Sequence, residues 1–211
     1  MLFNRDDYDK LSTLFDPELK YAGFKPDVFE RPNGNGGVDY EKKYLHIALK
    51  YNPPDFAINY LARAHFEACK VAESLKLGNV YPKVENGTLR VLEYPAGAGT
   101  EVHCDFDLFT INCYRETPED CEEFIETWQP MQRQMHMGEI GRLFNLGPAT
   151  PHRVQGKPYI QRSIVYFASP SLDTPLLSEY KFPSTDQDPE VIVRTTGEWQ
   201  MERVKRSRTY S

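Results

Sequence analysis

The chain contains 211 residues with a formal net charge of −6, and 40% of its residues are hydrophobic. This length fits one domain with a substantial core, and the composition is that of a globular protein and not of a disordered or fibrous one. The acidic balance argues against a wide surface for binding a nucleic-acid backbone. The longest clean apolar run, residues 164–168, is far shorter than the roughly 20 residues that cross a bilayer, so we expect no membrane partner.

Cysteine usage and the N-terminal sequence indicate the cytoplasm. The four cysteines include no Cys-x-x-Cys pair, which argues against a structural zinc site and against a disulfide scaffold. Residues 1–3 run directly into the polar segment 4–7, without the features of a secretory signal peptide. We therefore predict a cytoplasmic protein with reduced, mostly buried thiols.

The first part of the chain predicts one long helix. Residues 31–37 are rich in turn formers and predict a loop, whereas residues 44–51 could form a strand or a short helix. Apolar residues recur at three- and four-residue steps over 54–77, as one buried helix face requires. Asn52 is a candidate N-cap, and Gly78 can end the helix in a left-handed conformation.

Short strands separated by turn signals predominate after this helix. Alternation and β-forming residues predict strands at 89–94, 102–114, 141–146, 151–154 and 159–168. An acidic segment between them, 117–128, predicts a short helix, and the basic tail 203–208 is typical of a solvated terminus. A long helix followed by many short strands predicts an α+β domain built on a β-sandwich or barrel.

A possible metal site combines residues from two of these strands. His103 and Asp105 stand two residues apart, so both side chains point to the same face of a strand. His152 begins another predicted strand, 49 residues after His103. Two histidines and one carboxylate on a β framework form the facial triad that binds non-haem Fe(II). Three protein ligands on one face of the metal leave three adjacent coordination positions open for a bidentate cosubstrate and dioxygen.

Arg162 and Ser163 follow His152 on the next predicted strand. Arginine grips a carboxylate with two parallel N–H groups, and a serine hydroxyl adds one further hydrogen bond. Across a hairpin such a pair can lie near the metal. The ordered set therefore predicts a metal site beside a carboxylate-binding pair.

Together these motifs resemble the isopenicillin-N-synthase-like branch of the Fe(II)/2-oxoglutarate-dependent oxygenases. The resemblance covers residues 89–170 and depends on short segments, namely 93–95, 103–111, 151–154 and 162–167 with Pro170. Residues 196–199, with Arg203 after them, also resemble the closing helix of this family.

This resemblance implies a double-stranded β-helix, or jelly roll, in a mainly β, α+β fold. Residues 1–88 would form an N-terminal helical region packed on the major sheet. Residues 89–170 would form the jelly-roll core with the metal site, and 171–211 a C-terminal extension, all within a single domain, 1–211.

The resemblance also implies the roles of individual residues. His103, Asp105 and His152 would bind iron. Arg162 and Ser163 would hold the distal carboxylate of 2-oxoglutarate. Tyr94 matches a position where family members contact this cosubstrate, although packing at a strand end is an equally good explanation of an aromatic residue there.

The last strand departs from the family pattern, which is usually Arg-x-Ser with both side chains on one face. The spacing counted forward from His152 places Arg162 at the arginine position of this pattern. The spacing counted back from the end of the strand places Gln161 at that position instead, with Ser163 at the serine position. A bulge could reconcile the two counts.

The function that the resemblance implies is a dioxygenase that couples decarboxylation of 2-oxoglutarate to succinate with oxidation, by default hydroxylation, of a small-molecule substrate. No catalytic side chain is expected beyond the metal ligands. One alternative is an Fe(II)/O2 oxidase of the same branch that does not use 2-oxoglutarate, and another is a non-catalytic jelly-roll binding protein.

Aromatic residues and methionines after position 127 could line a substrate pocket, although packing is their commoner role: Trp128, Met131, Met135, His136, Met137 and Trp199.

Overall fold

The computed structural model describes residues 2–16, 27–32, 38–77, 80–100, 102–116, 121–123 and 135–208. Within 27–32, 38–42, 121–123 and 207–208 it describes the backbone alone. No helix in these parts of the chain is both long enough and apolar enough to span a membrane.

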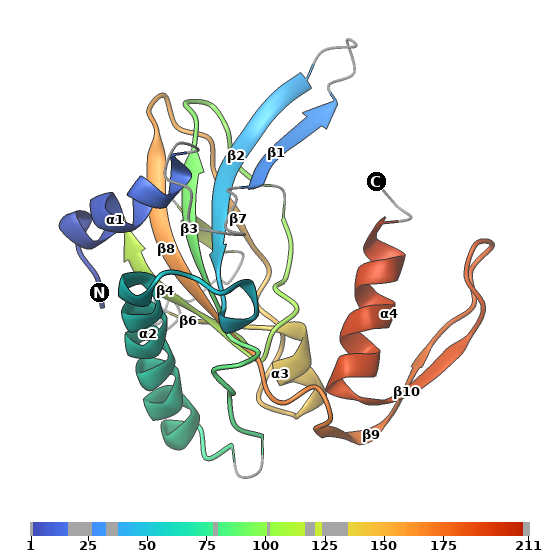
Figure 1. Cartoon of the computed structure of the whole chain (residues 1–211). Coiled ribbons are helices and arrows are strands. Elements are labelled where there is room, and N and C mark those ends of the chain that lie inside the picture. The colour runs from blue at the N-terminus through green and yellow to red at the C-terminus, as the bar shows by residue number, and fades with distance from the viewer. Residues whose placement is uncertain are drawn as a thin grey trace.

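The main sheet is antiparallel and has six strands in the described part of the chain, in the spatial order β1-β2-β3-β8-β4-β6 (Figure 1). Their bounds are β1 Asp27–Pro32, β2 Val38–Ile47, β3 Thr88–Tyr94, β4 Phe109–Arg115, β6 Met135–Met137 and β8 Gln161–Ala168. Strands β3 and β8 pair without interruption from Thr88 opposite Phe167 to Tyr94 opposite Gln161. Segments far apart in the sequence therefore form the centre of the sheet.

Two smaller antiparallel pairs accompany the main sheet. β5 (Cys121–Glu123) pairs with β7 (His152–Val154), and β9 (Pro175–Phe182) pairs with β10 (Val191–Thr195). An isolated bridge pairs His103 with His152 on the edge of β7 opposite to β5. The predicted α+β class with antiparallel sheets is confirmed.

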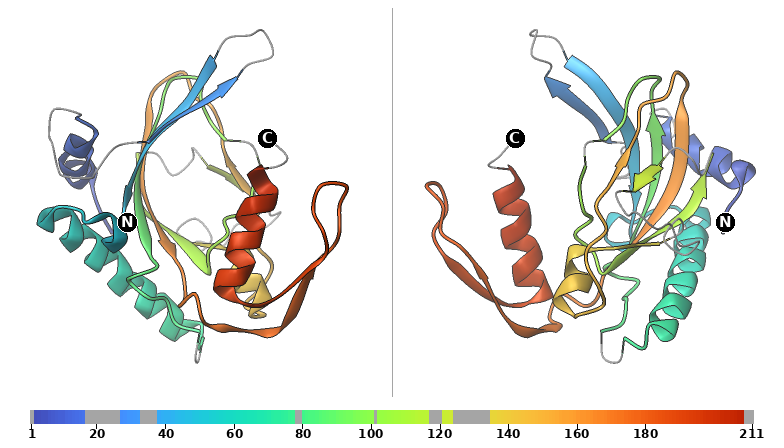
Figure 2. Two further views of the ribbon diagram at one scale, coloured as in Figure 1. Left: turned by 45° about the vertical axis from the view of Figure 1, so that its right-hand side comes forward. Right: turned by 180° about the vertical axis from the view of Figure 1, so that it is seen from behind.

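Two helices cover the outer side of the main sheet, as Figure 2 shows. They are α1 (Arg5–Ser12), which begins at a capping box formed by Asn4 and Asp7, and α2 (Asp55–Ser74). α2 turns a row of alanines and Leu61 into the core and contacts β2, β3 and β8. Small side chains on this face allow the helix to lie close to the sheet. A 3-10 turn follows each of α1 and β2, at Thr13–Phe15 and Leu49–Tyr51.

The C-terminal part lies on the other side of the sheet, where α4 (Thr196–Arg208) stands beside the β9-β10 hairpin (Figure 2). Trp199 is fully buried and contacts Phe106, Tyr180 and Phe182. Arg203 of α4 binds Glu139 of the short helix α3 (Glu139–Leu143). The basic tail continues as α4, and the prediction of a solvated terminus was wrong for Arg203 and for the buried Arg206.

Several predicted elements are confirmed with small shifts of their ends: the helix at 54–77 and the strands at 89–94, 151–154 and 159–168. The segment 44–51 divides, with a strand to Ile47 and a 3-10 turn after it. Asn52 is not the N-cap of α2. It adopts φ 50°, and Pro54 is the N-cap.

Two predictions in the second half were wrong. Residues 121–123 form strand β5 and not part of a helix, and the rest of 117–128 lies outside the described residues. The segment 141–146 belongs to α3 and the turn after it, not to a strand. Glycines explain this turn, because a Cβ at Gly138 would lie 1.9 Å from the carbonyl oxygen of Asp107 and one at Gly141 would lie 2.4 Å from that of Leu108. Backbone approaches this close require glycine. Gly78 and the loop residues 33–37 lie outside the described residues.

Candidate metal centre

Backbone pairing brings together the two parts of the predicted metal site. The N–H of His103 donates to the carbonyl of His152 at 2.9 Å, and the N–H of His152 donates to the carbonyl of His103 at 2.9 Å. Asp105 follows in the connection to β4, which begins only at Phe109. The regular strand predicted over 102–114 is therefore shorter, and a single bridge with the turn after it positions the His-x-Asp pair.

The three predicted ligands converge on one point. Nε2 of His103 lies 3.8 Å from Oδ1 of Asp105, and Nε2 of His152 lies 3.6 Å from Oδ2 of the same carboxylate. One donor atom of each residue lies within 4.8 Å of the other two. The side chain of His103 is 42% exposed, whereas those of Asp105 and His152 are 10% and 8% exposed. The site is therefore open to solvent on the His103 side.

Two threonines orient the ligands. The Thr110 hydroxyl donates to Oδ2 of Asp105 at 2.6 Å. Nδ1 of His152 lies 3.0 Å from the carbonyl oxygen of Thr150, which can only accept a hydrogen bond. That contact assigns the proton to Nδ1 and leaves the Nε2 lone pair directed at the ligand cluster.

Both buried ligands are in the protonation state that metal binding needs. Burial opposes ionisation of Asp105, but the facing His152 and the Thr110 hydroxyl outweigh it and hold the pKa of Asp105 below its ordinary value. Burial lowers the pKa of His152 to about 4, although the Asp105 carboxylate acts in the other direction. At neutral pH the site therefore presents a carboxylate and a neutral imidazole.

A third histidine lies next to the cluster without belonging to it. His136 on β6 is buried, and its ring centroid lies 4.3 Å from that of His152. His136 lines the cavity, as the sequence suggested. Trp199 and Met137 instead belong to the core, and Trp128 and Met131 lie outside the described residues.

A cavity extends from the candidate metal site along the inner face of the main sheet, where residues of β3, β8 and β4 line it. Every second residue of β8 lines it, namely Gln161, Ser163, Val165 and Phe167, and Tyr94 lines it from β3. This alternation follows the pleat of the strand. Ser163 and Tyr94, both predicted to contact the cosubstrate, therefore face the same cavity as the candidate metal ligands.

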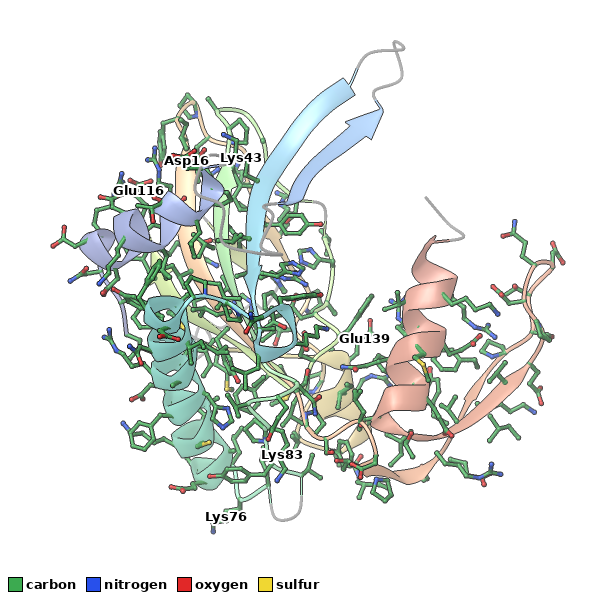
Figure 3. The ribbon with its side chains drawn as sticks, in the orientation of Figure 1. Asp16, Lys43, Lys76, Lys83, Glu116 and Glu139 are labelled. Atoms are coloured by element: carbon green, nitrogen blue, oxygen red, sulfur yellow. The ribbon has the colours of Figure 1, made fainter. Side chains whose placement is uncertain are left out.

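The guanidinium of Arg162 is engaged elsewhere, although the residue borders the cavity. Its Nε lies 3.4 Å from Oε2 of Glu93, and a terminal nitrogen lies 3.4 Å from Oε2 of Glu116. Glu116 also binds Arg5 of α1, and Figure 3 shows Glu116 beside that helix on the outer side of the sheet. The role of Arg162 in binding the cosubstrate stays a prediction.

The register of β3 and β8 shows whether Gln161 or Arg162 shares a face of the sheet with Ser163. Pairing runs without a bulge from residue 161 to residue 167, so Gln161 and Ser163 share the cavity face. The buried amide of Gln161 donates to the carbonyl of Gln155 at 2.9 Å. The bulge that could have reconciled the counts lies on β4 instead, between Asn112 and Tyr114.

Two arginines of the cavity wall were missed by sequence reasoning. Arg90 stands on β3, and Arg115 stands on β4 opposite Ser163. Arg90 lies four residues before Tyr94, so strand alternation could have placed it on the same face. Arg115 had no such signal, because the bulge on β4 changes which side chains face inward.

No family model and no curated protein matches the sequence. Solved structures do match. A full-length Neurospora crassa protein, crystallised in complex with alpha-KG and thymine, is 13% identical, with a TM-score of 0.63 over 98% of this chain and 85% of that one. JOX2 in complex with 2OG, Fe and JA is 12% identical, with a TM-score of 0.52 over 92% and 71%. The rice dioxygenase for auxin oxidation is 15% identical, with a TM-score of 0.50 over 97% and 77%.

Structural similarity at such low sequence identity establishes the fold, but it does not indicate which substrate this chain takes. The likeness nevertheless covers most of the chain, and the motifs that suggested the family converge in space. The chain therefore has the fold of the Fe(II)/2-oxoglutarate oxygenases.

Proposed function

We propose that this protein is a non-haem Fe(II) dioxygenase that couples the decarboxylation of 2-oxoglutarate to succinate with the oxidation of a small organic substrate. The convergence of His103, Asp105 and His152 at a cavity, on the fold of these oxygenases, carries the proposal. Two imidazoles and one carboxylate on one side are the donor set of non-haem Fe(II) oxygenases. The residues present therefore fit the metal.

The chain supplies the ligands and keeps them in place. His103, Asp105 and His152 would hold Fe(II), which when bound would supply the activation of dioxygen. Thr110 fixes the carboxylate of Asp105, and the Thr150 carbonyl fixes the ring of His152. Rigid partners of this kind keep ligands oriented and raise metal affinity.

The cavity wall also fits a dicarboxylate cosubstrate. We propose that Ser163 and Tyr94 contact its distal carboxylate and that Arg115, opposite Ser163 in the sheet, supplies the positive charge. Arg115 donates to Oδ1 of Asn112 at 2.9 Å, which holds its guanidinium on the cavity side. Arg162, which the sequence favours for this role, is already paired with two carboxylates.

The finer description of the fold is also part of this proposal. The main sheet would form one sheet of a double-stranded β-helix, and the β5-β7 pair with His103 bridged to β7 would form the other. Residues 1–211 would then be one dioxygenase domain, with the metal-site core at 89–170 and a C-terminal extension after it. The expected N-terminal helical region is only partly helical, because β1 and β2 lie within residues 1–88 and extend the main sheet beside α1 and α2.

Succinate formation tests the proposal. Purified protein is supplied with Fe(II), 2-oxoglutarate and dioxygen, and succinate is quantified with and without each component. Slow formation that depends on all three is expected, since decarboxylation without a primary substrate is inefficient. His152→Ala should abolish it, whereas His65→Ala, which changes a histidine of α2 outside the cavity, should not.

Two results would contradict the proposal in different ways. Iron binding without any use of 2-oxoglutarate would favour an Fe(II)/O2 oxidase on this fold. Absence of iron binding would favour a non-catalytic binding protein.

A further inference from the structure

Arg90 is a cation in the cavity wall that has no acidic partner in the described part of the chain. It lies in the middle of β3 and lines the cavity. Its Nε is buried and donates no hydrogen bond to any described residue. The carboxylate of Asp107 accepts a hydrogen bond from the Ser169 hydroxyl and forms no ion pair with Arg90 in the described part of the chain. A buried donor without a partner is costly unless a ligand uses it.

Aromatic rings hold the guanidinium of Arg90 in place. Its central carbon lies 4.2 Å from the ring centroid of Phe167 and 5.9 Å from that of Tyr44. The attraction of a cation to a ring face uses no N–H hydrogen bond, so these contacts leave the N–H groups of Arg90 available. These N–H groups match the two oxygens of a carboxylate. Arg90 is therefore pre-organised for an anion.

The sheet register places Arg90 close to the candidate metal centre. Phe167, against which Arg90 stacks, pairs with Thr110, the residue that holds Asp105. Arg115 lies opposite Ser163, which pairs with Leu92, two residues along β3 from Arg90. Two residues correspond to roughly 7 Å along a strand. The cavity thus presents two separate positive positions, with that of Arg90 toward the end where Thr110 holds Asp105.

We infer that the primary substrate carries a carboxylate and that Arg90 binds this group. The inference depends on the proposed function, because it assigns the cosubstrate carboxylate to Arg115 with Ser163 and leaves Arg90 for the substrate. Leu92, Val165 and Phe167 surround the position with apolar surface. A small carboxylate with an aromatic or aliphatic body therefore fits this wall.

Matched carboxylates and amides test the inference. Protein loaded anaerobically with Fe(II) and saturating 2-oxoglutarate is titrated calorimetrically with a panel of small aryl and alkyl carboxylates and their primary amides, beginning with phenylacetate and phenylacetamide. The titrations are repeated with Arg90→Gln, with Arg90→Lys and with Arg63→Gln as a matched control. Arg63 also stacks on aromatic rings, at 4.8 Å from Phe3 and 5.6 Å from Tyr60, but it lies outside the cavity.

At least one carboxylate should bind about 10- to 100-fold more tightly than its amide, as expected for a hydrogen bond between charged groups. Arg90→Gln should remove this preference and leave the dissociation constant of 2-oxoglutarate unchanged, Arg90→Lys should retain part of it, and Arg63→Gln all of it. Iron affinity, measured for each variant, reports whether the site is intact.

Three results would overturn the inference: no preference for carboxylates across the panel, a preference that survives in Arg90→Gln, or an Arg90→Gln variant that loses 2-oxoglutarate and not the panel carboxylate. Failure of the proposed function is distinguishable, because the wild type would then show no 2-oxoglutarate-dependent visible band. The comparison of carboxylates with amides can still be made with Fe(II) alone.

Discussion

Nε2 of His152 and Oδ2 of Asp105 lie 3.6 Å apart although 47 residues separate them in the chain. The backbone bridge to His103 holds His152 in place. A hydrogen bond from the Thr110 hydroxyl holds Asp105. If Fe(II) binds here as proposed, its affinity would therefore depend on groups that do not contact it.

The first prediction concerns Thr110. Thr110→Val keeps the shape of the side chain but removes the hydroxyl that donates to Asp105. We expect Fe(II) affinity to fall by about 10- to 100-fold, the usual effect of losing an outer partner of a ligand. Anaerobic titration against a competing chelator measures it. Thr13→Val, at an exposed threonine that bonds the carbonyl of Lys10, is the control, and equal affinity in the two variants would contradict the role of Thr110.

The second prediction separates Arg115 from Arg162. Arg115→Gln should weaken 2-oxoglutarate binding by about 10-fold or more, because a charge-assisted contact to a carboxylate is lost. Arg162→Gln should change it little, since Glu93 and Glu116 already neutralise that guanidinium. Anaerobic titration of each Fe(II)-loaded variant with 2-oxoglutarate gives both dissociation constants. The reverse result would restore Arg162 to the role that the family resemblance implies.

The third prediction concerns pH. Burial lowers the pKa of His152 to about 4 in the folded protein, below the value near 6.5 of an unfolded histidine. Between these values the unfolded state binds more protons, so this group makes the metal-free protein less stable as pH falls from about 6.5 to about 4. Proton NMR of the metal-free protein should show one histidine that stays neutral at pH 5 and is absent in His152→Gln. Titration of that resonance near pH 6.5 would contradict the account.

The fourth prediction concerns how the C-terminal helix is attached. Arg203 of α4 donates to both oxygens of Glu139 at 3.1 and 3.0 Å and stacks 4.7 Å from the centroid of Phe106. Figure 3 shows Glu139 on α3, facing α4. Arg203→Ala should lower the free energy of unfolding by about 1–2 kcal/mol, since a two-pronged, partly buried contact is lost with its stacking.

An exposed ion pair of the same type provides the control for Arg203. Arg194 pairs with Glu179, and both side chains are more than half exposed. Arg194→Ala should cost under about 1 kcal/mol, as surface pairs do. Urea unfolding of the two variants compares them, and equal losses would show that the contact between α3 and α4 contributes no more than a surface pair.

The sequence predicts the candidate metal ligands from short-range patterns. The His-x-Asp pair and the strand that begins at His152 are local features, and the family resemblance orders them. The alternation at 89–94 and 159–168 predicts β3 and β8 for the same reason. The convergence of these segments depends on strand pairing, which one sequence does not encode locally.

Other parts of the site were hidden from sequence reasoning for physical reasons. Asn112 and Arg115 both line the cavity although they stand three positions apart, which a regular strand does not permit. The bulge between Asn112 and Tyr114 causes this change of side. The pattern of residues over 141–146 predicts a strand, whereas the chain forms α3 and a turn there, with Gly141 against the backbone of Leu108.

The central claim is that this chain binds Fe(II) and 2-oxoglutarate together at His103, Asp105 and His152. The most direct test is anaerobic visible spectroscopy of the purified protein with both components, beside Asp105→Ala and the exposed control Asp186→Ala. The account predicts a metal-to-ligand charge-transfer band in the wild type and in Asp186→Ala, and none in Asp105→Ala. A wild type that binds Fe(II) without this band, or a band of full strength in Asp105→Ala, would contradict it.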